Sequence, residues 1–522
     1  MSSRYGHAEP TSATRTVRRL NPPNRLWGSN GVAFGPDGRL HVAQFLAGQI
    51  SAVDIASGDV EVVVPLDGPV QSPDDLAFGA DGSMYITDLV PGRVWRRSPL
   101  GEFTVVTDEV AVPNGITCVG DRLFVNEMKP GGRLLELFPD GGDPVVLADD
   151  LAMGNAMQLG PDGCLYYPHM ITGKVFRVPL DGGAPELVAE DVLEPVAVRF
   201  DLDGTLVVLS RGAAGIVTRL DLFGTGDRAL VASGVVGLDN AAFDDENRMF
   251  VSSFASGGIA EMSPDGRTRE VVPQGLDGPF GVTVDLGGTV RAADHYRIAD
   301  PGGATRELVT FVHGIVADGE LLHVTSQYGD VRTYDPATGV FRFRARGLDR
   351  PVGIAVRADG VLVVAESGSG RVLGIDVDDV VEVLGEGFGR PVDVALDAEG
   401  RCYVSDELGG AVFRVEGGRP VVVVEGLEAP QGLVVDGGEL VVVEVGTRRL
   451  LAVDVGTGEV RVEAEGLAVG LPGGGGRVEP ALFAQGMPGV PRQFAGLAVG
   501  VDGDLYVSGN GEGTVVRLSL RG

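Results

Sequence analysis

The residues best able to do chemistry in this sequence form a column of Asn and Asp side chains, each directly before a short apolar run. Successive positions are 33 to 44 residues apart until the last interval, which is 64. The first half of the column reads Asn30, Asp74, Asn114, Asn155, Val196 and Asp239, with Asp75 and Asn240 adjacent. The second half reads Phe280, His313, Val352, Val392, Gln431 and Ala495. Oxygen-bearing side chains therefore gather in one half, and mostly apolar side chains take their places in the other.

Carboxylates that converge within a few ångströms raise one another's pKa, and a hard cation relieves this repulsion. Calcium takes about 6 to 8 oxygen ligands and accepts a mixture of carboxylate, amide and water. The first half of the column has no His or Cys, which disfavours zinc. We therefore predict a divalent metal site, with Ca²⁺ as the best match, formed by Asn30, Asp74, Asn114, Asn155 and Asp239. The alternative is that each residue only caps a strand by accepting a hydrogen bond from nearby backbone N–H groups.

A second polar column follows the second strand of each repeat: Gln44, Asp88, Glu127, His169, Ser210 and Ser253. The residues after these are Phe45, Leu89, Met128, Met170, Arg211 and Phe254. Polar groups with an apolar rim are typical of a small-molecule pocket. His169 and Glu127 are the best general acid or base candidates, because their protonation changes near neutral pH if burial raises the carboxylate pKa. Carboxylates in the same column of the second half, such as Glu366 and Asp406, favour the alternative that such a group braces a turn.

The repeats around these columns predict the elements that position them. Segments such as 92–97 alternate apolar and polar residues, and turns such as Pro36-Asp37-Gly38 favour tight hairpins. A unit of about 40 residues with four strands is one blade of a β-propeller. Twelve such units predict an all-β protein of two consecutive six-bladed β-propellers, with twelve four-stranded blades. The first column would then form a ring at the mouth of each central channel.

The predicted domains are residues 1–265, which carry the site, and residues 266–522, with a structural or accessory role. Segments 14–20 and 267–272 both resemble a fourth, outer strand. We expect 14–20 to close the first ring and 267–272 to close the second; the alternative is an ordinary hairpin at 263–266. The irregular segment 467–493 is either a flap over the second ring or a solvated insertion.

Composition limits the partners. The net charge of -31 over 522 residues argues against nucleic acid and anionic membranes, which bind clustered Lys and Arg. Residues 1–20 lack the apolar run of a signal peptide, and no stretch approaches about 18 uninterrupted apolar residues. We expect a cytoplasmic protein that acts on a small molecule.

The repeats also resemble a known family. Pro113-Asn114-Gly115-Ile116, the Pro-Asp-Gly turns and strands ending in Asp or Asn are similar to SMP-30/gluconolactonase-like six-bladed propellers, and more loosely to NHL repeats. The resemblance implies an axial divalent ion held by Glu, Asn and Asp, and the opening of lactones or phosphoesters. Asn114 matches the family's metal-binding Asn. The family's Glu and Asp motifs should fall where this chain has Asn30 and Val196. Rotating the assignment by one blade places the ligands at Asp239, Asp74 or Asp75, Asn114 and Asn155, and Asn155 then departs from the family by standing where it has its catalytic Asp.

Three functions follow. The first is a divalent-metal-dependent hydrolase of a lactone or related ester, with Asp74, Asp75 or Asp239 activating water. The second is a metal-independent isomerase or cyclase in the same pocket, in which His169 and Glu127 carry the chemistry. The third is a non-catalytic binding or scaffold propeller, because propellers have many functions.

Overall fold

The computed structural model describes residues 9–302, 305–470 and 491–521. These residues contain no helix, and therefore none that could cross a membrane. Their strands form twelve four-stranded antiparallel sheets, each a propeller blade. The predicted all-β fold of two six-bladed propellers is confirmed.

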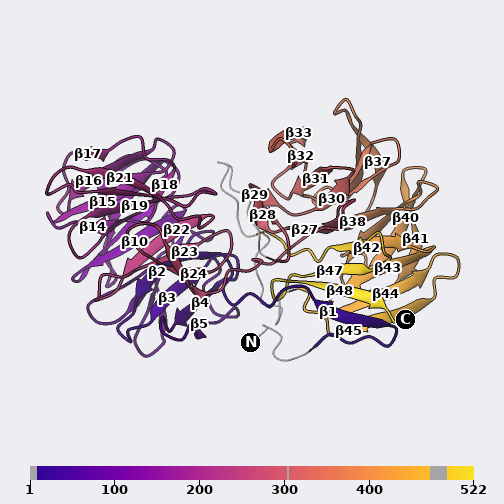
Figure 1. Cartoon of the computed structure of the whole chain (residues 1–522), viewed down its shortest axis with the longest axis horizontal. Helices are drawn as coiled ribbons and strands as arrows, with labels where there is room; N and C mark the ends of the chain where they lie inside the picture. The colour runs from indigo at the N-terminus through magenta and orange to yellow at the C-terminus, as the bar shows by residue number, and fades with distance from the viewer. Residues whose placement is uncertain (1–8, 303–304, 471–490, 522) are drawn as a thin grey trace. The chain divides into compact units, whose positions relative to one another are not determined.

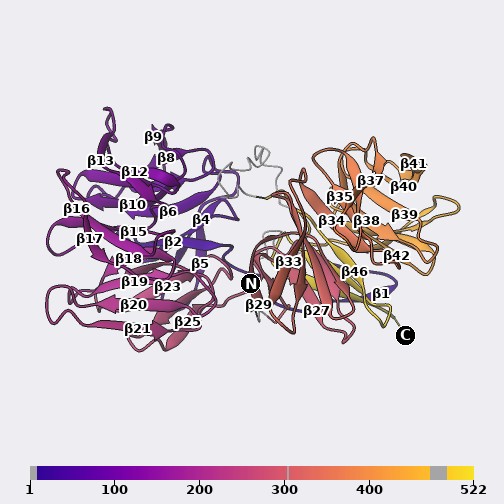
Figure 2. The ribbon, with the colours of Figure 1, turned by 90° about the horizontal axis from the view of Figure 1, so that it is seen from above.

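The first compact unit, here called the N-propeller, comprises residues 25–274. Its blades, in indigo to magenta in Figures 1 and 2, follow the chain in order. Blades one to three are β2 (Ser29–Phe34), β3 (Leu40–Gln44), β4 (Gln49–Val53) and β5 (Val60–Val64); β6 (Pro73–Phe78), β7 (Met84–Asp88), β8 (Arg93–Arg97) and β9 (Phe103–Thr107); β10 (Pro113–Val119), β11 (Arg122–Glu127), β12 (Pro130–Leu137) and β13 (Val145–Ala152). Blades four to six are β14 (Gln158–Leu159), β15 (Cys164–His169), β16 (Lys174–Pro179) and β17 (Glu186–Ala189); β18 (Pro195–Phe200), β19 (Leu206–Ser210), β20 (Ile216–Leu220) and β21 (Arg228–Ala232); β22 (Leu238–Phe243), β23 (Met249–Ser253), β24 (Ile259–Met262) and β25 (Thr268–Val272).

The second unit, the C-propeller, comprises the described residues 9–24, 275–470 and 491–521. Its first three blades are β26 (Val282–Val284), β27 (Val290–Ala293), β28 (His295–Ala299) and β29 (Thr305–Val312); β30 (Ile315–Asp318), β31 (Leu321–Ser326), β32 (Asp330–Asp335) and β33 (Val340–Arg346); β34 (Pro351–Val356), β35 (Leu362–Glu366), β36 (Arg371–Ile375) and β37 (Val381–Glu386). The last three are β38 (Pro391–Leu396), β39 (Cys402–Asp406), β40 (Ala411–Glu416) and β41 (Arg419–Glu425); β42 (Pro430–Asp436), β43 (Glu439–Glu444), β44 (Arg449–Asp454) and β45 (Val460–Glu465); and β46 (Leu497–Val499), β47 (Leu505–Gly509), β48 (Thr514–Leu520) and β1 (Arg15–Arg19).

The apolar residues of each blade pack against the next blade, so each propeller has a ring of small cores. In the N-propeller, Val42 and Leu40 of the first blade share a buried cluster with Phe250 and Val272 of the sixth. The ring is also closed by hydrogen bonds, because Ser252 Oγ donates to the carbonyl of Asn30 at 2.5 Å. The alternation along each strand thus fixes the inter-blade packing, and the first strand of each blade lies at the axis.

Ring closure differs from the prediction. β1 pairs with β48 and completes the sixth blade of the C-propeller; Figure 1 shows indigo β1 beside yellow β48. β25 pairs with β24 through the ordinary hairpin at 263–266 and belongs to the N-propeller. The expectation that 14–20 closes the first ring and 267–272 the second was therefore wrong. The predicted division after residue 265 moves to residue 274, and residues 9–24 belong to the C-propeller.

The physical reason is local. Both candidate strands have the same alternation, so their sequences do not distinguish their partners. A four-residue turn brings β25 onto β24 with little loop entropy, and this completes the N-propeller's sixth blade. β1 instead covers the edge of β48, where Val17 packs on the apolar core and Arg19 pairs with Glu512 at 2.6 Å.

Candidate functional site

Three axial residues of the N-propeller are joined by hydrogen bonds. Asn30 Nδ2 donates to Asp74 Oδ1 at 3.3 Å, and the Asn114 side chain also hydrogen-bonds to Asp74. These three side chains come from β2, β6 and β10 and are buried, whereas Asp239 at the start of β22 is half-buried. Asn30, Asp74, Asn114 and Asp239 are named the axial cluster here.

A β-bulge in each of the inner strands β2, β6, β10 and β22 aims these side chains at the axis. The register shifts between Ser29 and Val32 in β2, and between Pro113 and Ile116 in β10, so Asn30 and Asn114 fall within the bulges. A bulge places two residues opposite one and redirects a side chain. The next residue must then approach the neighbouring blade: a Cβ at Gly115 would lie 2.2 Å from the Asn155 carbonyl oxygen. This explains the Asn-Gly pair of the motif.

The carboxyls of the axial cluster hold protons more strongly than usual. Burial raises the pKa of Asp74 well above its ordinary value, and repulsion from Asp239 and Asp75 adds to this effect. Burial and repulsion from Asp75 raise the pKa of Asp239 to about 7, although Arg211 and Arg199 oppose the shift. Asp239 can therefore gain or lose a proton near neutral pH.

Asp75 lies beside the cluster, but its oxygens are occupied in joining blades. It accepts hydrogen bonds from the backbone N–H of Leu76 at 2.9 Å and of Ile116 at 3.3 Å, and from Asn240 Nδ2 at 3.1 Å. Burial raises its pKa to about 6. Asp393 in the C-propeller repeats this arrangement with the N–H groups of Val394 and Leu433, at 2.9 and 3.0 Å. The repetition in a ring without the axial cluster indicates a structural role for Asp75.

Arg199 lies near the axial carboxyls, and the sequence did not single it out. This buried residue of β18 donates to the carbonyls of Met157 and Ala241 at 2.8 Å each, and to Asn240 Oδ1. Asn240 in turn donates to Asp75, which accepts the N–H of Ile116. This chain of hydrogen bonds links blades two to six. Burial lowers the pKa of Arg199, while Asp75 and Asp239 oppose that shift. A charged residue within the apolar run of 195–200 was the available signal.

The axial cluster fits a hard cation. Asn30 Oδ1 is buried without a hydrogen-bond partner, next to the Asp74 carboxylate. The cluster has two carboxyl groups that repel each other, and amide groups lie beside them. Both kinds of group supply oxygen ligands that Ca²⁺ accepts. In the described part of the chain, no three His, Cys, Asp or Glu side chains form a group that could hold a metal, so amide oxygens would have to contribute.

Asn155 matches the capping alternative more closely. Its Oδ1 accepts the backbone N–H of Ala156 at 2.7 Å. Its Nδ2 faces Met128 Sδ at 3.7 Å, and Asn114 Nδ2 faces the same sulfur at 2.9 Å. Asn155 therefore lies beside the axial cluster with its oxygen already bonded.

Glu127 braces a turn, which is the alternative that the sequence left open. Its buried carboxylate accepts the N–H of Ala111 and that of Arg133, at 3.1 Å each, and pairs with the Arg133 guanidinium at 2.7 Å. Burial would raise its pKa, but the Arg133 and Ala111 hydrogen bonds prevail and lower it. Asp406 makes equivalent bonds to the N–H groups of Gly389 and Arg390.

His169 packs among aromatic rings. Its ring lies 4.5 Å from Phe176 and 5.7 Å from Tyr167, centroid to centroid. Burial lowers its pKa to about 4, so it is neutral at pH 7, and its Nε2 is buried without a partner. These contacts place His169 in the apolar layer between blades three and four.

The C-propeller fills its mouth with hydrocarbon, as predicted. Phe280, Val352 and Val392 form one buried cluster with Phe494. Phe494 directly precedes the column residue Ala495 and supplies the aromatic ring in its place. Residues 471–490 of the predicted flap lie outside the described residues. Past them, Arg492 crosses this mouth: its backbone N–H donates to Gln327 Oε1 at 2.9 Å, and its guanidinium pairs with Glu407 at 2.9 Å.

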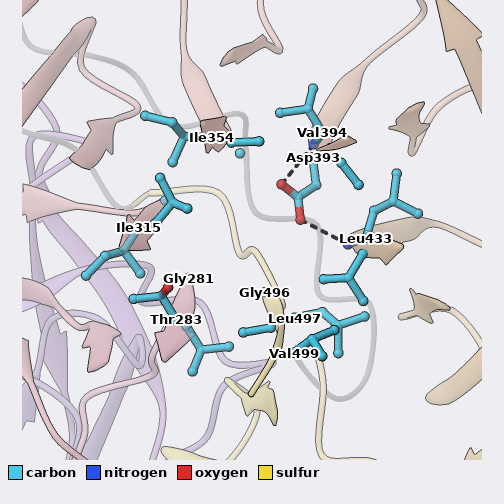
Figure 3. Close-up of a pocket in the computed structure, with 18 of the residues that line it drawn as sticks. Gly281, Thr283, Ile315, Ile354, Asp393, Val394, Leu433, Gly496, Leu497 and Val499 are labelled. Carbon is cyan, nitrogen blue, oxygen red and sulfur yellow. Dashed lines mark hydrogen bonds between the residues drawn. The ribbon is translucent and has the colours of Figure 1, made fainter. Parts of the chain in front are cut away.

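Beneath this plug the C-propeller contains an axial cavity of about 340 Å³ lined by its inner strands. Figure 3 shows Ile315, Ile354 and Leu497 around it, with Asp393 bonded to Val394 and Leu433. Arg199 bridges the corresponding inner strands of the N-propeller. One ring therefore has a polar mouth above an arginine bridge, and the other has an apolar plug above a cavity.

The fold and site thus define a pair of six-bladed propellers, one of which has a polar axial cluster. No family model matches the chain. A gluconolactonase of Zymomonas mobilis is 31% identical over 140 residues, which cover 23% of this chain and 37% of the relative. The resemblance to SMP-30/gluconolactonase-like propellers is thereby confirmed, although the chain spans little more than a third of that relative.

Two solved structures are similar to parts of this chain. A streptogramin B lyase has a TM-score of 0.39 and 18% identity, covering 54% of this chain and 95% of its own. A gluconolactonase of Xanthomonas campestris has a TM-score of 0.38 and 18% identity, covering 46% and 86%. Similarities this low say nothing about activity.

Proposed function

We propose that the N-propeller is a divalent-metal-dependent hydrolase of a lactone or related ester. The observation that carries this proposal is the axial cluster, in which the free Asn30 oxygen and the Asp74 carboxylate adjoin the half-buried Asp239. The partial similarity to a gluconolactonase supports the same reaction class. The substrate is a small molecule.

Asn30, Asp74 and Asn114 would hold the ion, and Ca²⁺ is the best match to their oxygens. A bound divalent ion supplies Lewis-acid chemistry, polarising a carbonyl and lowering the pKa of water. Asp239 has the pKa and the exposure to accept the proton of an attacking water on its carboxylate. Asp75 and Arg199 keep the inner strands in register beneath these groups.

The isomerase or cyclase hypothesis receives less support. It needs Glu127 and His169 to exchange protons, but Glu127 is bonded to Arg133 and His169 lies against Phe176. In the described part of the chain, neither residue has a hydrogen bond or ion pair with a member of the axial cluster. We therefore keep His169→Ala as a comparison variant, expected to retain metal-dependent activity.

The test is turnover of aldonolactones by the whole protein before and after chelation, with Ca²⁺, Mg²⁺, Mn²⁺ or Zn²⁺ restored separately. We expect activity to vanish with chelator and to return best with Ca²⁺. Asp239→Asn should lower kcat at least about 100-fold, in the range of a lost general base. Asp74→Asn should weaken calcium binding measured by calorimetry.

The matched control is Asp245→Asn, an exposed carboxylate of the same propeller, which should change neither quantity. Activity that persists through chelation, or survives in Asp239→Asn, contradicts the metal-dependent mechanism. Ligand binding without turnover of any lactone would instead favour the non-catalytic alternative.

A further inference from the structure

Arg211 is a cation beside the axial cluster whose donors are free. It follows β19, is half-buried, and its guanidinium carbon lies 5.1 Å from the centroid of the Phe254 ring. Several other arginines of the N-propeller pair with carboxylates, as Arg122 does with Glu136 and Arg219 with Asp201, whereas Arg93 and Arg97 lie over aromatic rings as Arg211 does. The Arg211 guanidinium has no ion pair or hydrogen bond among the described residues, so its five N–H groups remain available.

Backbone hydrogen bonds join the loop that carries Arg211 to the start of β22, which carries Asp239. The N–H of Gly237, two residues before Asp239, donates to the Gly212 carbonyl at 2.9 Å. The N–H of Phe254 donates in turn to the Gly237 carbonyl at 3.0 Å. The loops after β19 and β23 and the entry to β22 are thus joined, and the charge of Arg211 acts on Asp239 without forming an ion pair with it.

We propose that Arg211 binds an anionic group of the substrate, so that the N-propeller acts on lactones or esters that carry a carboxylate or phosphate. This inference rests on the proposed function. A guanidinium matches either anion through two parallel N–H···O bonds, and stacking on an aromatic ring fixes its plane before the ligand arrives. Because the loop that carries Arg211 is bonded to the start of β22, which carries Asp239, an anion held by Arg211 would keep the rest of the molecule near the axial cluster.

The first experiment compares a neutral aldonolactone with its phosphorylated form and with a lactone that bears a carboxylate. We expect the wild-type protein to prefer at least one acidic lactone by kcat/KM. Arg211→Gln should reduce the ratio of acidic to neutral kcat/KM at least 10-fold, mainly through KM. Arg211→Lys should retain part of that ratio. The control Arg93→Gln, which removes another stacked arginine of the same propeller, should leave the ratio unchanged.

An equal loss for neutral and acidic lactones, or no preference in the wild-type protein, overturns the inference while the hydrolase proposal stands. A second measurement does not require turnover: calorimetric titration with inorganic phosphate and, separately, with an aldarate dianion. The anion that binds the wild-type protein identifies the group, and we expect Arg211→Gln to lose that binding at least 10-fold. If no lactone is hydrolysed but this loss is seen, the anion site stands without the hydrolase. If neither anion binds and no lactone is hydrolysed, both proposals fail.

Discussion

At the scale of single residues, side chains of one type have different tasks according to which atoms they meet. Asp74 and Asp75 are neighbours in one bulge, yet Asp75 bonds two backbone N–H groups and Asp74 faces only amides of the axial cluster. Asp393 shows that the Asp75 arrangement recurs where there is no axial cluster. Neighbouring carboxyls thus divide into one that joins blades and one that is free to take a ligand.

Asp393 leads to a prediction about pH. Burial raises its pKa to about 7, against an unfolded value near 3.9. The folded state therefore binds more protons than the unfolded state between these values, and the contribution of Asp393 to stability falls as pH rises from about 4 to about 7. The stability advantage of the wild-type protein over Asp393→Asn should shrink by about 1 kcal/mol or more between pH 5 and pH 8.

Urea denaturation at several pH values measures this difference. Asp378→Asn, an exposed carboxylate of the same propeller, serves as the control and should show no such trend. A gap between wild type and Asp393→Asn that is constant with pH contradicts the prediction.

At the scale of elements, the bulged inner strand is the unit that makes the site. It places the column residue at the axis and forces a small residue beside the next blade, as Gly115 shows. Gly314, directly before the regular strand β30, is equally close to its neighbouring blade. A Cβ at Gly314 would lie 2.0 Å from the Val352 carbonyl oxygen. The motif therefore has a packing cause as well as a chemical one.

Gly115→Ala tests this cause. The added Cβ would meet backbone at 2.2 Å, so the inner strands of blades three and four must separate. We expect a loss of about 1–3 kcal/mol in unfolding free energy, as overpacked cores show, together with weaker calcium binding. Gly456→Ala, at an exposed turn where the nearest atom is 3.4 Å away, should change the urea midpoint little. Similar losses in both variants would contradict the packing argument.

At the scale of the whole molecule, the two rings close in different ways. The N-propeller contains all its strands in one continuous segment, whereas the C-propeller takes β1 from before that segment. In sequence, the N-propeller is thus inserted between β1 and β26. The C-propeller depends on this strand because the edge of β48 would otherwise be unpaired.

A circular rearrangement tests this dependence. A chain of residues 275–522 alone should be aggregation-prone, because it leaves β48 as an open edge. Joining residues 9–24 to its end by a flexible linker should restore a soluble, cooperatively unfolding propeller, while residues 25–274 alone should fold without any addition. Circular dichroism and sedimentation distinguish these outcomes. A well-folded 275–522 fragment without β1 would contradict the proposed role of that strand.

The sequence by itself determined the blades, their number, the two rings and the contrast between a polar and an apolar axis, because alternation and spacing are local properties. Asn30, Asp74 and Asn114 could be found from their column for the same reason. Only the tertiary structure decided which ring β1 closes, because β1 and β25 have the same alternation and either could be the outer strand of the N-propeller's last blade. The hairpin at 263–266 pairs β25 with β24, and β1 pairs with β48. The tertiary structure also decided that Glu127 braces a turn of its own blade and that Arg199 and Arg211 lie near axial carboxyls of other blades, because alternation and spacing along the chain do not say which side chains meet.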